Sequence, residues 1–458
     1  MEKFILAGVA LALSGCFHNI APKEPVNRGL LVVDGLTEEP AFDVEFEPGT
    51  GRSIFSWTSV TGSTASVVSI AAVDGTGLAI WKASPMATET RGPLQFEARV
   101  AVSSANVFTS WDEYLLGSFS LNAAVLDADG DQLPMKARIH GISKVKRDKN
   151  VMVAAEGDSA ALAWEDYDPI VKTTYVGVSE VGPGGLRWTR ILGDKDENER
   201  YLNPVLAPAG ADGVLVAFRH LHNGDKGIVV RRFNADGTTW ADDAQASDAI
   251  SYKSNPQLAE NGLGGAFVVW EDGRNGSLDL YAQHISSFGA VLWNPGGIPV
   301  SVTEGNSWNP VVTSDGGGSF YCAWIDDNKG SRWELKVQRV DRNGTPMWGP
   351  GGLTVCESEN KQSMPSIVSD GEGGCVLVWN EARDGTLNIF AQRLDPDGER
   401  LWEESGVPVV SPGADHIWPH MVADGDGGLV VAWKQQDPAK KWRIKAQRLD
   451  EDGVPLWK

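Results

Sequence analysis

Residues Met364 to Trp402 read MPSIVSDGEGGCVLVWNEARDGTLNIFAQRLDPDGERLW, and this stretch decides the fold. Apolar and polar residues alternate along it, and each alternating run stops at a cluster of Asp and Gly that is typical of a tight hairpin turn. Gly398 can adopt the positive φ that such a turn requires. The pattern therefore predicts four short antiparallel strands. They cover Ser366 to Ser369, a run ending at Trp379, Asn388 to Leu394, and a segment opened by Arg400 to Trp402, with turns at 370–374 and 395–398.

Close variants of this stretch recur along the whole chain. The aromatic residue of the second strand returns every 52 to 55 residues, and the aromatic residue of the fourth strand keeps the same spacing. A fixed repeat of roughly this length is the signature of a propeller or solenoid. Because two independent anchors agree on eight units, we predict an all-β chain folded as an eight-bladed β-propeller. The anchors are Trp57, Trp111, Trp164, Phe218, Trp270, Trp324, Trp379 and Trp433 for the second strand, and Trp81, Met135, Trp188, Trp240, Trp293, Trp348, Trp402 and Trp457 for the fourth. Met135 is the one position at which a non-aromatic residue replaces the aromatic.

A third anchor separates regular units from degenerate ones. A proline that we expect to open the first strand stands 14 residues before the second-strand aromatic, but only from the fourth unit onward. The first three units lack it and are therefore the degenerate part of the repeat. The prolines are Pro204, Pro256, Pro310, Pro365 and Pro419.

The two ends of the chain are complementary. Gly29 to Val33 (GLLVV) lines up with Gly406 to Val410 (GVPVV), whereas the last unit stops at Trp457-Lys458, one strand short. We predict that Leu30 to Val33 supplies the missing outer strand of the last blade, beside Arg443 to Arg448. This pairing closes the ring and removes an exposed sheet edge.

The first residues resemble an export signal. Met1 to Gly15 contain a lysine and a short apolar run. The sequence Leu13-Ser14-Gly15-Cys16 at its end resembles the lipobox of bacterial lipoproteins. The resemblance implies cleavage before Cys16 and lipidation of its thiol; Phe17 in place of an aspartate favours the outer membrane of the cell envelope. An ordinary secretory signal with an incidental cysteine is the alternative. The predicted organisation is a signal peptide at 1–15, a lipidated tether at 16–28 and the propeller at 29–458.

The chain is strongly acidic, with a net charge of −21. Nucleic acids bind basic surfaces, so we exclude nucleic acid as a partner. The one basic run, Lys136 to Lys149, falls on the outer edge of the second blade and the following loop. It is either a solvated outer strand or a contact for anionic headgroups or an acidic partner.

Three cysteines remain besides Cys16, and none forms a C-x-x-C motif. Cys322 and Cys375 stand at even offsets from second-strand tryptophans, which places them on the buried face of the strand. We therefore expect buried free thiols. Cys356 with Cys375 is the one pairing worth testing, because an exported protein can form disulfides.

Two tryptophans outside the repeat anchors point to a binding site. Trp308 and Trp418 precede the prolines of first strands, as Tyr201 nearly does. In a propeller the loops that enter first strands and those that leave second strands share one face, so these aromatics should surround its mouth. A funnel with aromatics, arginines and carboxylates suits a polar ligand or a peptide. The predicted binding residues are Tyr201, His220, His222, Arg274, Trp308, Arg383 and Trp418.

Each of these residues has a structural alternative. Arg274 and Arg383 occupy the same repeat offset, so they could pair with carboxylates of a neighbouring blade and serve the repeat alone. His220 and His222 share one side of a strand, but no further ligand is placed to complete a metal site. The turn Asp127 to Asp131 has its glycine at the wrong position for a calcium loop. We expect no metal and no cofactor.

The run W-N-E-A-R-D-G-x-x-N-I-F-A-Q-R-L-D-P-D-G-x-x-L-W, read from Trp379 to Trp402, resembles a repeat of secreted bacterial proteins with sialidase-like propellers. More loosely, strands followed by a turn glycine and Trp resemble the eight-bladed quinoprotein-like propellers. Quinoprotein dehydrogenases would carry adjacent cysteines, and this chain has none. Sialidases would need an arginine triad with a Tyr/Glu pair, and no such set can be assigned here. The resemblance implies a fold and leaves the function open.

Two functions follow as hypotheses. We favour a monomeric, lipid-anchored scaffold without enzymatic activity, which binds an envelope protein or a glycan at the loop face and touches the membrane only through Cys16. No catalytic constellation survives its structural alternative. The other hypothesis is a glycoside hydrolase or lyase at the funnel mouth, which would use a carboxylate such as Glu271 or Glu381. That hypothesis rests on analogy with folds that host such chemistry.

Overall fold

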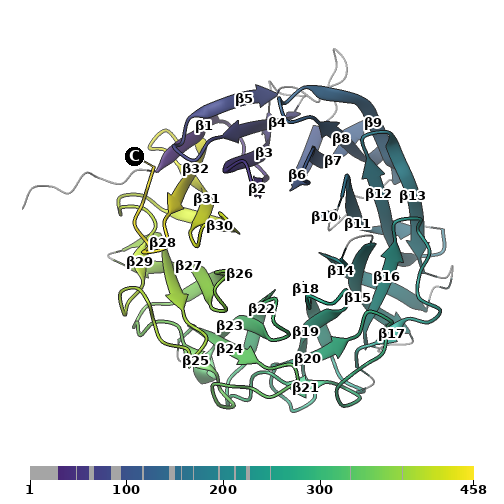
Figure 1. Cartoon of the computed structure of the whole chain (residues 1–458), viewed down its shortest axis with the longest axis vertical. Coiled ribbons are helices and arrows are strands. Elements are labelled where there is room, and N and C mark those ends of the chain that lie inside the picture. The colour runs from purple at the N-terminus through teal and green to yellow at the C-terminus, as the bar shows by residue number, and fades with distance from the viewer. Residues whose placement is uncertain are drawn as a thin grey trace, which may run out of the picture.

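The computed structural model describes residues 29 to 457 except for 48, 61–65, 84–93, 116–117, 144–149, 156, 169, 194–195, 197, 211–212, 223–226, 248, 331 and 384. Eight four-stranded antiparallel sheets stand around a central axis (Figure 1), which confirms the eight-bladed β-propeller. Within these residues the only helical element is a 3-10 turn, η1 (Asn328–Gly330), and no helix is long and apolar enough to cross a membrane. The predicted signal peptide, Cys16 and the tether lie outside the described residues.

Blades 1 to 7 run from an innermost to an outermost strand in chain order, and blade 8 takes its outermost strand from the start of the described chain. We number the blades by the position of their innermost strands in the sequence. The innermost strands are β2 (Phe42–Glu47), β6 (Leu94–Val102), β10 (Asn150–Ala155), β14 (Glu199–Pro208), β18 (Lys253–Glu260), β22 (Ser307–Ser314), β26 (Gln362–Ser369) and β30 (His416–Ala423). The second strands are β3 (Arg52–Val60), β7 (Val107–Leu115), β11 (Ser159–Asp168), β15 (Gly213–His222), β19 (Ala266–Asp272), β23 (Phe320–Asp326), β27 (Cys375–Arg383) and β31 (Leu429–Gln436).

The two outer layers follow the same order. The third strands are β4 (Ser66–Val73), β8 (Ser118–Leu126), β12 (Thr173–Gly182), β16 (Gly227–Asn234), β20 (Asp279–Ile285), β24 (Glu334–Val340), β28 (Thr386–Leu394) and β32 (Trp442–Leu449). The outermost strands are β5 (Ala79–Ala83), β9 (Gln132–Ser143), β13 (Gly185–Leu192), β17 (Ala244–Gln245), β21 (Ile298–Pro299), β25 (Leu353–Thr354), β29 (Val407–Pro408) and, for blade 8, β1 (Leu30–Leu36).

The ring closes through its two ends, as predicted. β1 pairs antiparallel with β32, with Leu30 opposite Ala446 and Leu36 opposite Trp442. Figure 1 shows the purple start of the described chain beside its yellow end. Arg443 Nε also donates to Asp34 Oδ1 at 2.6 Å across the closure. Blade 8 is therefore built from both ends of the chain.

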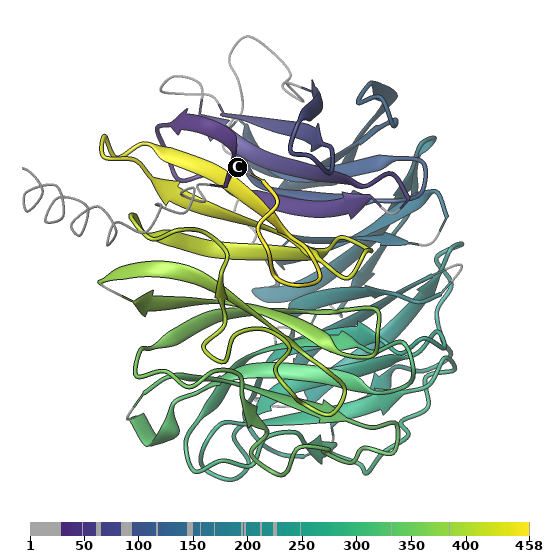
Figure 2. The same cartoon turned by 60° about the vertical axis from the view of Figure 1, so that its left-hand side comes forward.

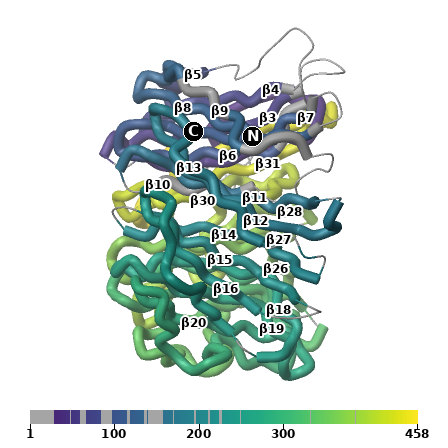
Figure 3. Tube along the Cα trace, turned by 90° about the vertical axis from the view of Figure 1, so that its right-hand side faces the viewer, coloured from purple at the N-terminus to yellow at the C-terminus, as the bar shows by residue number. Residues whose placement is uncertain are grey.

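The hydrophobic core lies between neighbouring blades. Eight clusters of buried side chains fill the eight interfaces, and successive blades stack on one another in the side views (Figures 2 and 3). All eight second-strand aromatics are at most 1% exposed. A buried tryptophan removes about 150 to 250 Å² from water, so one in almost every blade supplies much of the packing between blades. Cys322 and Cys375 are buried and free, as expected, and Cys356 is buried and free as well.

A glycine recurs beside the tip of the second-strand tryptophan in four blades, because the indole ring leaves no room for a side chain there. A Cβ atom on Gly406 would lie 2.6 Å from Cη2 of Trp379, and the φ of Gly406 is +78°. Gly297, Gly352 and Gly29 meet Trp270, Trp324 and Trp433 in the same way. Only glycine satisfies both the positive φ and the close approach of the indole.

The proline of the first strand does not open that strand, as the sequence suggested, but lies inside it. In blade 7 the register shifts between Ser363 and Ser366, and Met364, just before the proline, has a φ of +51°. A shift of this kind is a β-bulge, which inserts an extra residue and bends the strand. The same bulge with a positive φ recurs in five other blades. The residues concerned are Glu97, Asn203, Asn255, Asn309 and Trp418.

The other strand boundaries also differ from the prediction for blade 7. β27 continues four residues beyond Trp379, to Arg383. Arg400 to Trp402 belong to the turn, where Arg400 forms one isolated bridge with Leu394, and the outermost strand is only Val407–Pro408. Blades 1 to 3 have longer outermost strands, which contain Trp81, Met135 and Trp188. Most of the basic run Lys136 to Lys149 likewise lies in outermost strand β9, as expected, and 144–149 are not described.

Candidate functional site

The two faces of the ring carry different loops. The connection face carries the loops between second and third strands and those that lead from one blade to the next; the hairpin face carries the other two sets of turns. Because the start of each first strand pairs with the end of the second, Tyr201 lies opposite His220, and Trp308 opposite Ile325. All seven predicted binding residues therefore belong to the connection face, but they are spread over blades 4 to 8.

Three of the predicted residues come together in blade 4. The ring of Tyr201 stacks on that of His220, with centroids 4.4 Å apart and an interplanar angle of 20°. The carboxylate of Glu199 binds Nε2 of His220 and Nδ1 of His222. Sequence reasoning missed Glu199, which is buried at the start of β14. In the part of the chain that the structure describes, no group of three or more His, Cys, Asp or Glu side chains suits a metal ion.

Arg274 and Arg383 are held in equivalent clasps. In blade 7, Trp379 Nε1 donates to Glu381 Oε2 at 3.0 Å, and Arg383 Nε donates to Glu381 Oε1 at 2.7 Å. The guanidinium carbon of Arg383 also lies 3.5 Å from the ring centroid of Phe390. Blade 5 repeats this arrangement with Trp270, Asp272, Arg274 and Tyr281. The carboxylate partner belongs to the same blade, two residues earlier, and not to a neighbouring blade as the structural alternative assumed.

The carboxylates that a hydrolase would need are already engaged. Glu381 is 0% exposed; burial alone would raise its pKa, but hydrogen bonds from Arg383, Ser358 and Trp379 outweigh burial and lower the pKa to about 2. Glu271 accepts hydrogen bonds from Ser254 Oγ at 2.7 Å and from the backbone N–H of Asn309 at 2.9 Å. It thereby ties blade 5 to blade 6.

The two tryptophans that the sequence grouped together have different surroundings. Trp308 is partly buried against the core between blades 6 and 7, and it meets Trp333 edge to face with centroids 5.1 Å apart. Trp418 is 48% exposed and is itself the bulge residue, with a φ of +57°. A bulky side chain at positive φ is strained, and such strain clusters at functional sites. Of the two, only Trp418 is open to a ligand.

Trp418 lines a cavity in the central channel, which we call the channel cavity. Its volume is about 480 Å³, and its walls come from β30, β31, β2, β6, β10 and β14. Nζ of Lys434 lies 5.8 Å from the ring centroids of both Trp418 and Phe42, and it forms an ion pair with Glu39 at 2.9 Å. The cavity thus offers an aromatic surface beside a cation, in a chain that is acidic overall.

Beside the channel cavity, His420 of blade 8 faces the acidic innermost strand of blade 1, β2. The ring of His420 lies 4.7 Å from that of Phe42, and its Nδ1 is 3.4 Å from Asp43 Oδ1. Burial, with a contribution from the nearby Asp43 charge, raises the pKa of Glu45 to about 8. Sequence reasoning singled out none of these residues, because the contact between His420 and Asp43 joins positions 377 residues apart.

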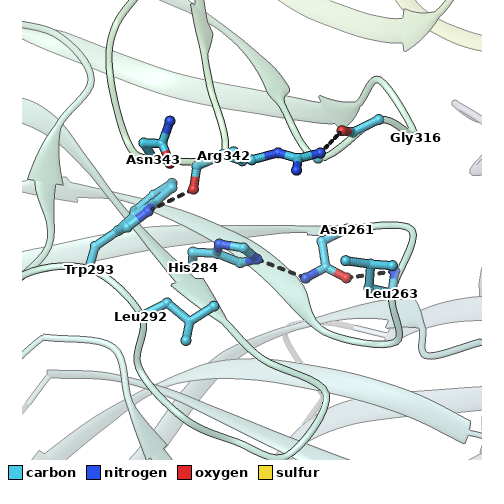
Figure 4. Close-up of a pocket in the computed structure, with 10 residues that line it drawn as sticks. Asn261, Leu263, His284, Leu292, Trp293, Gly316, Arg342 and Asn343 are labelled. Carbon is cyan, nitrogen blue, oxygen red and sulfur yellow. Dashed lines mark hydrogen bonds between the residues drawn. The ribbon is translucent and has the colours of Figure 1, made fainter.

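A second and larger cavity opens on the hairpin face between blades 5 and 6. Its volume is about 560 Å³, and none of the seven predicted residues lines it (Figure 4). Trp293, expected only as a repeat anchor, and His284, which the pattern did not single out, stand side by side in its wall. This cavity on the hairpin face shares no residue with the channel cavity, so the two are separate.

No protein-family model matches the sequence, and no curated protein matches it. Among solved structures, a prolyl endopeptidase is 12% identical with a TM-score of 0.46, and the match covers 88% of this chain but only 54% of that one. The β-propeller domain of the Trilobed protease from Pyrococcus furiosus is 8% identical with a TM-score of 0.43, covering 81% and 97%. An α-L-arabinanase from Penicillium chrysogenum is 13% identical with a TM-score of 0.35, covering 79% and 94%. These similarities are too low to carry an inference about function.

Proposed function

We propose that this propeller is a non-enzymatic scaffold that binds a partner protein at the channel cavity, with a glycan as the alternative ligand. The observation that carries the proposal is Trp418, a half-exposed tryptophan held at positive φ on the cavity wall. Three of the equivalent bulge residues are asparagines, which tolerate this backbone conformation, so tryptophan here is a departure from the repeat.

The surroundings of Trp418 fit a protein ligand. Tryptophan is enriched among the few residues that carry most of the energy of protein interfaces. Lys434 approaches the same ring and is only partly neutralised by the exposed Glu39. An aromatic or acidic side chain of a partner would find both a flat apolar surface and a cation in the channel cavity.

The hydrolase hypothesis is less well supported. A general acid or nucleophile must reach the substrate bond. Glu381 is 0% exposed and clamped by Arg383, and Glu271 holds two blades together. Substitution of either carboxylate is therefore expected to weaken the fold before it affects any chemistry.

Photo-crosslinking in cells tests the scaffold proposal. A photoreactive residue at position 418 should give a protein crosslink, and Trp418→Ala should weaken capture of that partner by at least tenfold, because truncation of a central interface tryptophan costs about 2 kcal/mol or more. Position 308 is the matched control, because Trp308 is packed between blades. Equal crosslinking from both positions, or no crosslink from 418, would contradict the proposal.

Glycans provide the competing outcomes. A glycan array and a glycan-hydrolysis screen should be run with the wild-type protein and with Trp418→Ala. If Trp418→Ala loses glycan binding and no protein crosslink is found, the ligand of the channel cavity is a glycan and not a protein. Turnover that is abolished by Glu271→Gln or Glu381→Gln, while the variant remains folded, would overturn the scaffold and establish the hydrolase.

We further propose that Cys16 anchors the protein by lipid in the outer membrane of a bacterial envelope, a proposal that rests on the lipobox-like sequence alone. Growth with labelled palmitate should label the protein, and Cys16→Ala should abolish the label and release the protein from membranes. Membrane attachment that persists in Cys16→Ala would mean that a partner holds the protein there.

A further inference from the structure

An ion pair recurs on the hairpin face of blades 6 to 8. An aspartate in the turn after the first strand faces an arginine near the end of the third strand, and each arginine also donates to a backbone carbonyl of the next blade. The guanidinium group thus fills the space between two blades. The pairs are Asp315–Arg339 (3.3 Å), Asp370–Arg393 (3.0 Å) and Asp424–Arg448 (2.8 Å), and the carbonyls belong to Pro396, Glu451 and Gly75.

Blade 4 keeps the arginine of this pair although it lacks the aspartate. Arg232 occupies the third-strand position and donates to the carbonyl of Gly264 in blade 5 at 3.1 Å. Ala209 stands where the later blades have aspartate. Of the two residues of the pair, the arginine that bridges to the next blade is therefore present in more blades than the aspartate. Among blades 4 to 8, only blade 5 lacks this arginine.

Blade 5 replaces the pair by Asn261 and His284. Asn261 Oδ1 accepts hydrogen bonds from the backbone N–H groups of Leu263 at 2.9 Å and Gly265 at 3.0 Å, so its Nδ2 is the atom that faces His284 Nε2 at 2.9 Å. His284 Nε2 must accept this hydrogen bond, which places the ring proton on Nδ1. Burial also lowers the pKa of His284, which favours the same neutral form.

The shorter histidine leaves a space that arginine fills elsewhere. Among the described residues the His284 ring forms no hydrogen bond to blade 6, and the 560 Å³ cavity opens beside it. In Figure 4 the ring stands between Trp293 and Asn261, with Arg342 of blade 6 across the cavity. This volume lies within the usual range for a small-molecule site, which is roughly 300 to 1,000 Å³.

Three apolar side chains line this cavity. Leu263 is 76% exposed and Leu292 is 50% exposed, and both line it. Trp293 is fixed by a hydrogen bond from its Nε1 to the carbonyl of Arg342 at 3.2 Å, and it belongs to a group of touching rings with Phe267 and His284. A flat or ring-shaped ligand could pack on these surfaces.

Two polar side chains of the cavity, His284 and Arg342, can donate hydrogen bonds to a ligand. Nδ1–H of His284 points away from Asn261 (Figure 4), and the Arg342 guanidinium uses one N–H on the carbonyl of Gly317 at 3.0 Å. Of the described residues that line the cavity, none is acidic. The exchange of aspartate and arginine for Asn261 and His284 removes one charge of each sign, so the cation that an anion would meet in this cavity is Arg342.

The carboxylates near the rim are occupied. Glu260 accepts hydrogen bonds from the backbone N–H groups of Gly262 and Gly264, and Asp341 accepts them from Asn343 and Thr345. Asp315 accepts two more and also pairs with Arg339. Their negative charges are thus partly compensated by their own turns, and an anion bound at Arg342 would not face an unpaired carboxylate.

We propose that the cavity between blades 5 and 6 binds a small ring-bearing carboxylate, whose ring packs on Trp293 and whose carboxylate accepts hydrogen bonds from Arg342 and His284. The site is separate from the channel cavity, and it needs no enzymatic activity.

Two pairs of probes test the proposal on the full-length protein in detergent. Binding of 4-fluorobenzoate and D-glucuronate is compared with binding of their neutral counterparts, 4-fluorobenzamide and D-glucose, by ¹⁹F NMR and calorimetry. At least one acid should bind at least about tenfold more tightly than its counterpart, and Arg342→Ala should weaken it by about tenfold or more, as expected for lost hydrogen bonds to a charged group. Arg190→Ala, an exposed arginine in blade 3, should leave binding unchanged.

The sharpest variant restores the repeat. N261D combined with H284R recreates the pair of blades 6 to 8, which should fill the cavity and abolish binding while the protein stays folded. If this variant does not fold, the loss of acid binding in Arg342→Ala still tests the proposal, because Arg342 is exposed and its replacement should not disturb the fold. The proposal fails if neither acid binds at millimolar concentration, if acid and neutral probes bind equally, or if binding survives in the refilled cavity.

Discussion

Blades 7 and 4 solve the same packing problem with different residues. In blade 7, Trp379 donates to Glu381, which holds Arg383, and Gly406 leaves room for the tip of the indole ring. In blade 4 the same positions are occupied by Phe218, His220, His222 and Asp243. Phenylalanine has no N–H and no second ring, so blade 4 has no indole for a carboxylate or a glycine to accommodate. Tryptophan does not always have the carboxylate, because blade 8 has Gln435 at that position.

The comparison shows which residues depend on one another. One exchange of tryptophan for phenylalanine frees three other positions, and blade 4 uses them for two histidines that converge on Glu199 and for an ion pair between Asp243 and Arg231. Departures from the repeat therefore occur in groups. Each group can be tested by converting one blade toward the other.

The largest effect is expected at the centre of the blade 7 clasp. Glu381→Gln leaves Arg383 without its charged partner and weakens hydrogen bonds from Trp379 and Ser358, so the free energy of unfolding should fall by about 3 to 5 kcal/mol, as for one partner of a buried ion pair. Urea denaturation at neutral pH measures this loss. A loss below about 1 kcal/mol would mean that the clasp does not hold the blade.

The pH dependence of the same variant provides a control. The pKa of Glu381 is lowered to about 2 from an ordinary value of 4.5, so its stabilising contribution is complete above pH 4.5 and is lost as the pH falls toward 2. The stability curves of wild type and Glu381→Gln should therefore converge in acid. A constant difference between pH 7 and pH 3 would show that the variant acts through packing and not through charge.

The second effect concerns the glycine beside the indole. Gly406→Ala would place a Cβ 2.6 Å from Trp379 at a φ of +78°, so we expect a loss of about 2 to 3 kcal/mol from overpacking and strain. Thermal unfolding of the purified protein checks this. Gly385→Ala is the matched control, because Gly385 has a φ of +80° and nothing within 4 Å of the added Cβ.

The third test converts blade 4 toward blade 7. Phe218→Trp should lower the stability by about 1 to 3 kcal/mol, because a larger ring must enter a filled core. Asp243→Gly made in the same chain should recover part of this loss, beyond the sum of the two single effects. A double-mutant cycle measures this coupling. Strict additivity would disprove the dependence between the two positions.

The smallest effect is expected at Glu199. Glu199→Gln keeps the size of the side chain and can still bond His220 or His222, so the loss should be about 1 kcal/mol. The same measurement on Glu381→Gln sets the scale. If both substitutions lower the free energy of unfolding equally, Glu199 stabilises blade 4 as much as Glu381 stabilises blade 7, which would contradict the expected difference between the two blades.

The sequence was sufficient for the architecture. The anchor positions of Trp379 and Trp402 recur in every blade, with Phe218 and Met135 as the exceptions to tryptophan, and therefore report the number of blades. The match of Gly29 to Val33 with Gly406 to Val410 predicted the closure. The bulge was missed because a residue before proline is normally extended, whereas Met364 has a φ of +51°. A pattern of residue types does not reveal such an unusual backbone conformation.

The candidate sites were less accessible to sequence reasoning. Trp308 and Trp418 look alike in sequence, and only the structure shows that one packs between blades while the other faces the channel cavity. Lys434 and Phe42 meet in that cavity from opposite ends of the chain. The exchange of aspartate and arginine for Asn261 and His284 was visible in an alignment of the repeats, but its meaning depends on the bridge that the arginine makes to the next blade.

The closure of the ring has a consequence for the order of events during synthesis. β1 is made first and β32 last, and the ion pair between Asp34 and Arg443 joins residues 409 positions apart. The first strand must therefore wait, unpaired, until the final blade has emerged. If the protein is exported as an unfolded chain, its ring can close only after β32 has crossed the membrane. A chain whose synthesis stops within blade 8 would have every earlier blade complete and the ring still open.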